Sequence, residues 1–315
     1  MTAAYHNCNR SSMGAAALTT SGFPIDRNRV KELLAFEELV ENSYDAIGGA
    51  DYLGETATAI KLAAINLGRV VQDLLLWCTQ EFAAIKVASP YVQISSIMPQ
   101  KRNPVSLEHM RSLLSSCVGN ADSVLAMMHN TPFGDIVDTE DDMQPYAWRS
   151  LELMDKMYRL LSVVVGTMEV NKEVLRKRTE SSFATVTELA DTLVRTDKLS
   201  FRTSHHIVST VVKRAMAEGI AANQITWEFV NDVARECIGR NLSMDINSFK
   251  QSLDPDNFIQ VRTLPGGPSP QEMDRMIQLR HHEQLGLEQW LTESGHKSRT
   301  ALENLDEVMR EWGNP

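Results

Sequence analysis

Apolar side chains recur at steps of three and four residues along most of the chain, which is the spacing of one face of an α-helix. Between residues 55 and 86 this repeat includes Ile60, Ala64, Leu67 and Val71, and no proline interrupts it. The segment predicts one helix of about 30 residues, which would be roughly 45 Å long. We find no convincing run of alternating polar and apolar residues, so the sequence predicts an all-α fold.

Two more long helices are expected after the first. One covers residues 105–128, and the other covers residues 141–170 with a break or kink near Pro145. Long antiparallel helices with apolar stripes are typical of a helix bundle. The stripe on the first helix is wider than one neighbouring helix requires, which indicates either full burial within one chain or contact with a second subunit. It consists of Leu67, Val70, Val71, Leu74 and Leu75.

After Asn171 the pattern changes to shorter helices separated by polar segments. A Pro- and Gly-rich stretch at residues 254–270 is the clearest loop. We therefore expect two domains: a central helical-bundle domain over residues 1–170 and a smaller C-terminal helical domain with a tail over residues 171–315. The shorter helices are expected at residues 183–195, 201–218, 227–237, 270–291 and 301–312.

The overall charge limits the class of ligand. The chain has 315 residues and a formal net charge of −10. This charge argues against nucleic-acid binding, because no basic face is available for phosphates. An anionic small molecule remains compatible with it, since a cationic pocket can lie inside an acidic surface.

The four cysteines are far apart in the chain and form no metal-binding spacing, which predicts free thiols in a reducing compartment and no metal site. No stretch approaches the roughly 20 apolar residues of a membrane span, and the N-terminus lacks the apolar core of a signal peptide. We therefore expect a cytoplasmic protein that binds neither membranes nor nucleic acid. The cysteines are Cys8, Cys78, Cys117 and Cys237.

Candidate catalytic groups concentrate in one segment, residues 95–104, which reads SSIMPQKRNP. Asn103 before Pro104 is expected to be the N-cap of the next helix, because both residue types favour these positions. The partly positive N-terminus of that helix would then face whatever the segment binds. A carboxylate suits such a position.

The side chains of this segment suit proton removal from a carbon beside a carboxylate. Lys101 supplies a positive charge and Asn103 an amide, and together they can stabilise the enediolate-like species formed when the proton leaves. The hydroxyl of Ser95 is a weak base when neutral, so its ionised form would need nearby cations and N–H donors. The alternative is an ordinary surface loop, to which an isolated Ser-Ser pair usually belongs.

The segment resembles the signature loop of the fumarase/aspartase superfamily, and together with residues 106–108 (SLE) it is similar to that of argininosuccinate lyases. The resemblance implies that Ser95 is the general base. The family's characteristic glutamate corresponds to Glu108, for which the competing interpretation is an exposed charge on a helix. The residues that the resemblance assigns to substrate binding are Ser96, Lys101, Asn103 and Glu108.

Similarity to this family extends along most of the chain, up to about residue 278. It implies a long-helix bundle of the fumarase/aspartase type that eliminates fumarate from an N-substituted aspartate such as argininosuccinate, a reaction of arginine biosynthesis that needs no cofactor. It also implies a homotetramer with active sites shared between subunits. The matching stretches are Gly22–Arg27, Glu41–Ala46, Asp73–Phe82 and Ala184–His206.

Three features depart from the family pattern. Family members are longer, and two of their earlier signature regions have no match here, including the one with the histidine assigned to acid–base work. We therefore expect either a truncated product or a partner that supplies the rest. Ile94 stands where the family has glycine before the serine pair. Residues 133–142 read FGDIVDTEDD, where the family has a YNKDLQ-like stretch that contacts the arginine part of the substrate. The sequence therefore leaves the amine half of the substrate open. The acidic residues of this stretch suit a cationic amine.

Among the histidines, His109 is the best candidate within the chain for proton transfer, although a packing role explains it more simply. His205 and His206 are adjacent on a predicted helix and face different directions, which favours a structural role over a metal pair.

Two rival functions stay open. One keeps the lyase chemistry but changes the substrate to another aminodicarboxylate or to an adenylosuccinate-like nucleotide, although that last branch usually has histidine at the position of Gln100. The other is a non-catalytic helical scaffold.

Overall fold

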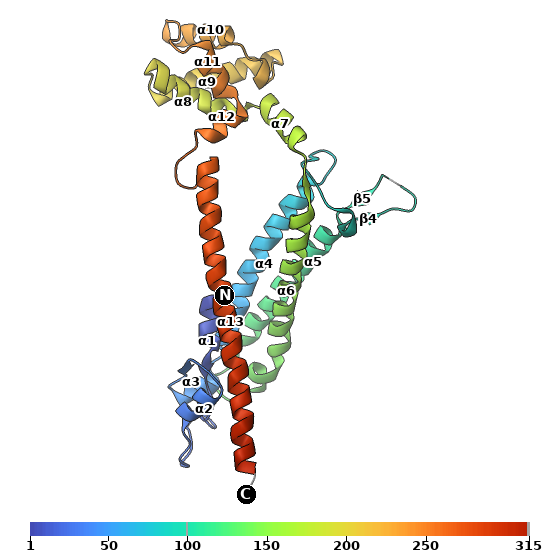
Figure 1. Ribbon diagram of the computed structural model, residues 1–315, viewed down its shortest axis with the longest axis vertical. Coiled ribbons are helices and arrows are strands. Elements are labelled where there is room, and N and C mark those ends of the chain that lie inside the picture. The colour runs from blue at the N-terminus through green and yellow to red at the C-terminus, as the bar shows by residue number, and fades with distance from the viewer. Residues whose placement is uncertain (99, 314–315) are drawn as a thin grey trace. The chain divides into compact units, whose positions relative to one another are not determined.

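A computed structural model of the chain describes residues 1–98 and 100–313, so Pro99 of the serine segment lies outside the described residues. Helices dominate the described part (Figure 1), and each strand within it is two residues long. The all-α class expected from the sequence is confirmed. The chain divides into two compact units, which are described separately. Unit 1 contains Met1–Val170 and the residues from Gln289 onward, and unit 2 contains Asn171–Glu288.

Unit 1 is built around three long helices, α4 (Asp51–Trp77), α5 (Val105–Met128) and α6 (Gln144–Thr167). α5 packs along both α4 and α6, and its bounds are those expected from the sequence. The shorter elements of this unit are α1 (Thr2–Cys8), β1 (Arg10–Ser11), α2 (Arg27–Leu33), β2 (Glu38–Leu39), α3 (Ser43–Gly48), β3 (Ile85–Lys86), the 3₁₀ turn η1 (Ser89–Tyr91), β4 (Gln93–Ile94), β5 (Arg102–Asn103), the π-helical turn η2 (Asp138–Asp142) and β6 (Glu169–Val170).

Two clusters of buried apolar side chains fill the bundle of α4, α5 and α6. One cluster joins the second half of α4 to the first half of α5 and the second half of α6, and it includes Val71, Leu107 and Met157. The other joins the start of α4 to the end of α5 and the start of α6, and it includes Ala57 and Val124. Consecutive long helices are therefore antiparallel (Figure 1), and the two ends of α5 lie at opposite ends of the bundle.

α4 ends at Trp77, earlier than the apolar spacing predicts. The hydroxyl of Thr79 donates a hydrogen bond to the carbonyl oxygen of Leu76 (2.8 Å) and accepts one from the N–H of Phe82 (3.4 Å). These bonds form a turn that ends the helix. The predicted helix through residue 86 is therefore too long, because apolar spacing continues into a segment whose local hydrogen bonds favour a turn.

The break expected near Pro145 corresponds to the start of α6. Pro145 lies in the first turn of that helix, where a missing N–H costs no intrahelical hydrogen bond. The acidic residues Asp138–Asp142 form a separate π-helical turn before it.

Unit 2 has its own apolar core, formed mainly by α8 (Val186–Asp197), α9 (Phe201–Glu218), α10 (Trp227–Ile238) and α11 (Ile246–Leu253). α9 has the bounds expected from the sequence. The remaining elements are α7 (Lys172–Ser181), the 3₁₀ turns η3 (Phe183–Thr185) and η4 (Ala222–Gln224), α12 (Pro255–Gln260) and the first part of α13 (Pro270–Gly313).

α13 is one continuous helix and replaces the two helices expected at residues 270–291 and 301–312. No proline follows Pro270 within it, and the polar residues between the two apolar stretches are compatible with helix. The expected C-terminal domain differs from the observed division in its tail, because the residues from Gln289 onward group with unit 1. There the ring of Trp290 contacts that of Tyr5 edge-on, with centroids 4.7 Å apart.

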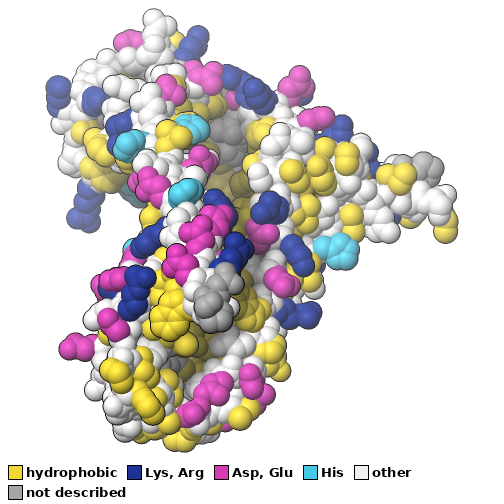
Figure 2. Space-filling view, turned by 60° about the horizontal axis from the view of Figure 1, so that its bottom comes forward, with side chains coloured by type: hydrophobic (Ala, Val, Ile, Leu, Met, Phe, Trp, Pro, Cys, Tyr) yellow, Lys and Arg dark blue, Asp and Glu magenta, His cyan; other side chains and the backbone are white. Residues whose placement is uncertain are grey.

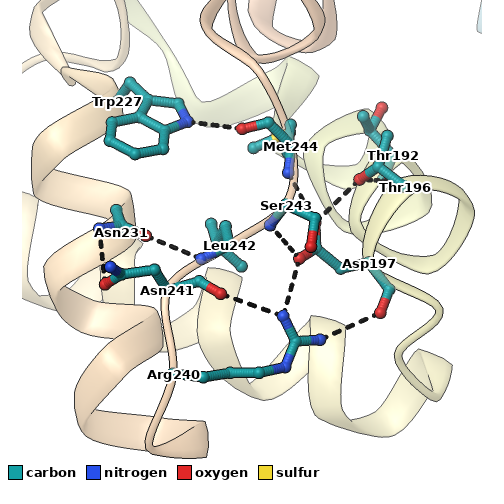
Figure 3. Close-up of polar contacts among 10 residues, drawn as sticks. All are labelled: Thr192, Thr196, Asp197, Trp227, Asn231, Arg240, Asn241, Leu242, Ser243 and Met244. Atoms are coloured by element: carbon teal, nitrogen blue, oxygen red, sulfur yellow. Dashed lines mark hydrogen bonds and ion pairs between the residues drawn. The ribbon is translucent and has the colours of Figure 1, made fainter.

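A buried carboxylate joins two segments of unit 2 (Figure 3). Asp197, the last residue of α8, has a fully buried side chain. Its oxygens accept hydrogen bonds from the backbone N–H groups of Ser243 (2.5 Å) and Met244 (3.2 Å). They also accept from Nη1 of Arg240 (3.2 Å) and Oγ1 of Thr196 (3.0 Å). Because a buried charge is costly unless it is paired, these bonds favour one arrangement of the loop of residues 240–244 against α8.

We predict that Asp197→Ala destabilises unit 2 by about 3–5 kcal/mol, since it removes the acceptor of the Ser243 and Met244 N–H groups and breaks the ion pair with Arg240. Chemical denaturation measures this loss. Asp232→Ala is the matched control, because Asp232 is 60% exposed and pairs with Arg235 on the same helix; a loss within about 0.5 kcal/mol is expected there. Equal losses in the two variants would contradict the prediction.

Glu272 lies in the first turn of α13. We expect its contribution to the folding stability of unit 2 to be lost at acidic pH. Arg275 and the N–H of Gly266 both donate to this carboxylate and lower its pKa to about 2. Its unfolded pKa is about 4.3, so the stabilisation is complete above about pH 5 and is lost as the pH falls towards 2. The difference in melting temperature between the wild type and Glu272→Gln should shrink over that range. A difference that stays constant from pH 7 to pH 2 would contradict this.

Candidate active site

The serine segment forms a β-hairpin at the start of α5 (Figure 1). β4 and β5 pair in antiparallel orientation, with Ile94 opposite Arg102. Ser95 directly follows β4, and Lys101 directly precedes β5. The pairing therefore brings the two ends of the predicted catalytic segment close together.

The hydroxyl oxygen of Ser95 accepts two backbone hydrogen bonds. The N–H groups of Ile97 and Met98 lie 3.2 Å and 3.1 Å from it. The carbonyl oxygen of Met98 in turn accepts from the N–H of Lys101 (2.9 Å). Hydrogen bonds donated to an oxygen favour its ionised form, so this turn supplies the N–H donors that a serine base requires.

The other predicted site residues are accessible to a ligand. Ser96, Lys101 and Glu108 are exposed, and Asn103 is half-buried like Ser95. Among the described residues, the side chains of Lys101, Asn103 and Glu108 have no hydrogen-bond or ion-pair partner. Lys101 and Asn103 are therefore available to donate to a bound anion, whereas the carboxylate of Glu108 can only accept hydrogen bonds.

Asn103 is not the N-cap of α5, contrary to the expectation from the sequence. The N-cap is Pro104, and no side chain among the described residues caps this helix. Leu107 and Glu108 donate their backbone N–H groups to the carbonyl oxygen of Pro104 (2.9 and 3.1 Å). Asn103 instead pairs with Gln93 in the hairpin, and this extended pairing decides its conformation.

The histidine candidates receive no support from contacts. His109 is exposed on α5, and no contact among the described residues joins it to the serine hairpin. His205 and His206 are exposed on α9 in unit 2. Within the described residues there is no group of three His, Cys, Asp or Glu side chains that could hold a metal ion. None of the described helices is long and apolar enough to span a bilayer.

The acidic segment lies at the other end of the bundle, between α5 and α6. Tyr44 donates its hydroxyl to the carbonyl oxygen of Phe133 (3.0 Å). Gly48 approaches the same loop so closely that an added Cβ would lie 2.9 Å from the N atom of Gly134. Asp135 raises the pKa of Glu140 through a hydrogen bond and through charge repulsion. These contacts hold several carboxylates near one another.

A cavity of about 710 Å³ lies beside this acidic segment. Carboxylates outnumber cations in its lining, and Arg10 is the cationic side chain found there. The 24 residues of α5 separate this cavity from the serine hairpin, which corresponds to about 36 Å along the helix axis. The acidic residues that line the cavity are Asp45, Asp51, Glu55 and Glu140.

Sequence reasoning missed one contact of the hairpin. Nη2 of Arg102 donates to the carbonyl oxygen of Val87 (3.4 Å) and to Oγ of Ser89 (3.2 Å). Arg102 stands inside the recognised segment, yet nothing in the order of residues indicates that its side chain bonds to a segment 13 residues earlier.

Solved structures share this fold. EDDS lyase in complex with formate has a TM-score of 0.90 at 28% identity, over 98% of this chain and 62% of that chain. A class II fumarase from Schistosoma mansoni has the same fold, with a TM-score of 0.62 at 15% identity over 80% of this chain. The antiparallel bundle with its serine hairpin places the chain in the fumarase/aspartase superfamily.

Sequence relatives identify the family within this superfamily. The family model for Lyase matches residues 1–119, which include the serine hairpin, and the model for Argininosuccinate lyase C-terminal matches residues 183–260. Argininosuccinate lyase 2 of Agrobacterium fabrum is 43% identical over 86% of this chain, and argininosuccinate lyase 1 of Shouchella clausii is 34% identical over 98% of it. The chain belongs to the argininosuccinate lyase family. It spans 54% and 61% of the length of these two relatives.

We predict that Asn103→Ala changes the stability of unit 1 by no more than about 0.5 kcal/mol, because Asn103 does not cap α5. Asn42→Ala is the matched control in the same unit. Asn42 is the N-cap of α3, and its side chain accepts from the N–H groups of Tyr44 and Asp45; its loss should cost about 1 kcal/mol. Chemical denaturation distinguishes them. A larger loss at Asn103 than at Asn42 would mean that Asn103 is a cap after all.

Proposed function

We propose that the chain carries the serine-base part of a carbon–nitrogen lyase, which eliminates fumarate from an N-substituted aspartate such as argininosuccinate. The observation that carries this proposal is the hydroxyl of Ser95, which accepts two backbone N–H bonds. Lys101 and Asn103 belong to the same hairpin, and their side chains have no polar partner within the described part of the chain. Its relatives named argininosuccinate lyase and the similarity to EDDS lyase support it.

In the proposed reaction the ionised oxygen of Ser95 removes a proton from the carbon next to one carboxylate of the aspartate half. The electron pair left by that proton moves onto the carboxylate, which becomes a dianion. Lys101 and Asn103 stabilise this charge, and interactions that strengthen as charge develops are those that accelerate a reaction. The electron pair then forms the double bond of fumarate while the C–N bond breaks. The departing amine takes up a proton as it leaves.

Substrate binding in this proposal involves more than one copy of the chain. The serine hairpin and the acidic segment lie at opposite ends of a bundle about 36 Å apart, so they cannot contact the same small molecule within one chain. A homotetramer with shared active sites, as the family resemblance implies, brings such ends together from different copies. We propose that the chain binds this small-molecule substrate and other copies of itself, and neither membranes nor nucleic acid.

Exposed apolar side chains give this association a surface. Of the wide stripe on α4, Leu67, Val71 and Leu74 are buried within the chain, whereas Val70 is 48% exposed. Trp148 on α6 is 61% exposed. Hydrophobic side chains also appear among charged ones on the face seen in Figure 2. Contiguous exposed apolar patches are typical of protein–protein contacts, and we propose that these side chains form part of one.

For the amine half we propose a cationic group, because carboxylates predominate around the cavity beside the acidic segment. An opposite charge there favours binding of an ammonium or guanidinium group. We also propose a cytoplasmic location, which agrees with the four free cysteine thiols.

We predict that Ser95→Ala lowers kcat for fumarate release by about 100-fold or more, because general-base catalysis contributes about 10²–10⁴-fold. Fumarate is followed by ultraviolet absorbance with argininosuccinate and a panel of N-substituted aspartates bearing cationic, neutral or acidic amine halves. Ser96→Ala is the neighbouring control and is expected to change kcat less than Ser95→Ala.

The oligomeric state is measured for both variants, so that lost assembly is not read as lost chemistry. Turnover that survives in Ser95→Ala would reject the serine as base. A wild-type protein that assembles but releases no fumarate from any substrate would favour the non-catalytic scaffold over the lyase.

A further inference from the structure

The hairpin that carries Ser95 has little structure of its own. β4 and β5 pair over two residues each, and a two-stranded hairpin in water is marginally stable. Ile94 is 71% exposed, Ile97 is 89% exposed and Met98 is 46% exposed. These side chains contribute little burial that would hold the hairpin in one conformation.

Arg102 connects this hairpin to the body of unit 1. Its Nη2 donates to the carbonyl oxygen of Val87 and to Oγ of Ser89, at 3.4 Å and 3.2 Å. Val87 is 4% exposed, and its side chain belongs to the apolar core between the long helices. Val87 also follows β3, which pairs with β6 at the end of α6. The guanidinium is therefore bonded to a segment whose position the core decides.

The position of Arg102 in the ladder links it directly to Ser95. Arg102 is opposite Ile94, the residue before Ser95. A shift of β5 would move Ile94 with it and change where the Ser95 hydroxyl lies. It would also disturb the turn in which Ile97 and Met98 donate to that hydroxyl.

We propose that Arg102 is a positioning residue, which holds the Ser95 hairpin in its reactive conformation through its bonds to Val87 and Ser89. Arg102 contacts no reacting atom in this role. It acts on the placement of Ser95, and this part of the inference rests on the proposed lyase function. A displacement of about 1 Å at a reacting group can cost up to about 100-fold in rate, so the effect of losing Arg102 is expected in kcat.

The test compares Arg102→Met, which keeps the length of the side chain but removes its donors, with Arg102→Lys, which keeps a charge and can still donate. Arg102→Met is expected to lower kcat for fumarate release about 10-fold with KM changed by less than about twofold. Arg102→Lys should recover part of that loss. Arg29→Met is the matched control, because Arg29 is exposed and pairs with Glu32 one turn away on α2; it should change neither constant.

A second measurement does not depend on activity. Amide hydrogen exchange of Ile97 and Met98 reports whether their N–H groups still bond to Ser95. Both amides should exchange at least about threefold faster in Arg102→Met than in the wild type or Arg29→Met, with the melting temperature of unit 1 nearly unchanged. This arm gives a result even if the wild-type chain releases no fumarate, so failure of the proposed function is distinguishable from failure of this inference.

Two outcomes would overturn the assignment. Unchanged exchange of Ile97 and Met98 in Arg102→Met would show that the hairpin keeps its conformation without Arg102. A rise in KM with kcat unchanged would show that Arg102 binds the substrate rather than positions the base.

Discussion

The packing of α5 against α4 and α6 is the constraint on which the proposed site depends. Side chains of α5 such as Leu107, Met110 and Leu114 are almost completely buried, and burial of each large apolar side chain stabilises by about 1.5–3 kcal/mol. The helix is thereby held between its neighbours, with the serine hairpin at its start and the acidic segment after its end. Since α5 spans about 36 Å, the same packing that stabilises unit 1 also separates the two predicted substrate-recognition regions.

The serine hairpin obtains its geometry from contacts outside itself. Its strands are too short to be stable alone, so the bonds from Arg102 to the segment after β3 and the turn around Ser95 decide where the hydroxyl lies. The same turn directs two N–H groups at Ser95, and the side chain of Lys101 pairs with no group in residues 1–98 or 100–313. A site of this kind can be complete in its local hydrogen bonds while still depending on another copy of the chain for the rest of its substrate contacts.

Sequence reasoning succeeded where a structural signal is local or periodic. The apolar repeat located α5 and α9 with the bounds found in the structure, and the ordered residues 95–104 identified the family. It failed where a longer-range or competing local bond decided the outcome. Hydrogen bonds of Thr79 end α4 before its apolar repeat ends. Pairing with Gln93 takes Asn103 away from the cap position that its sequence context favours.

The sequence by itself determined the helical class, the family and the chemical groups available for catalysis, because helix formation follows from apolar spacing and a motif follows from residue order. The tertiary structure alone decided which of those groups meet. It set the bond from Arg102 to Val87 and the bonds from Ser243 and Met244 to the buried Asp197. Each of these joins residues that are far apart in the chain, and periodicity along a helix does not specify which distant segment its buried face will contact.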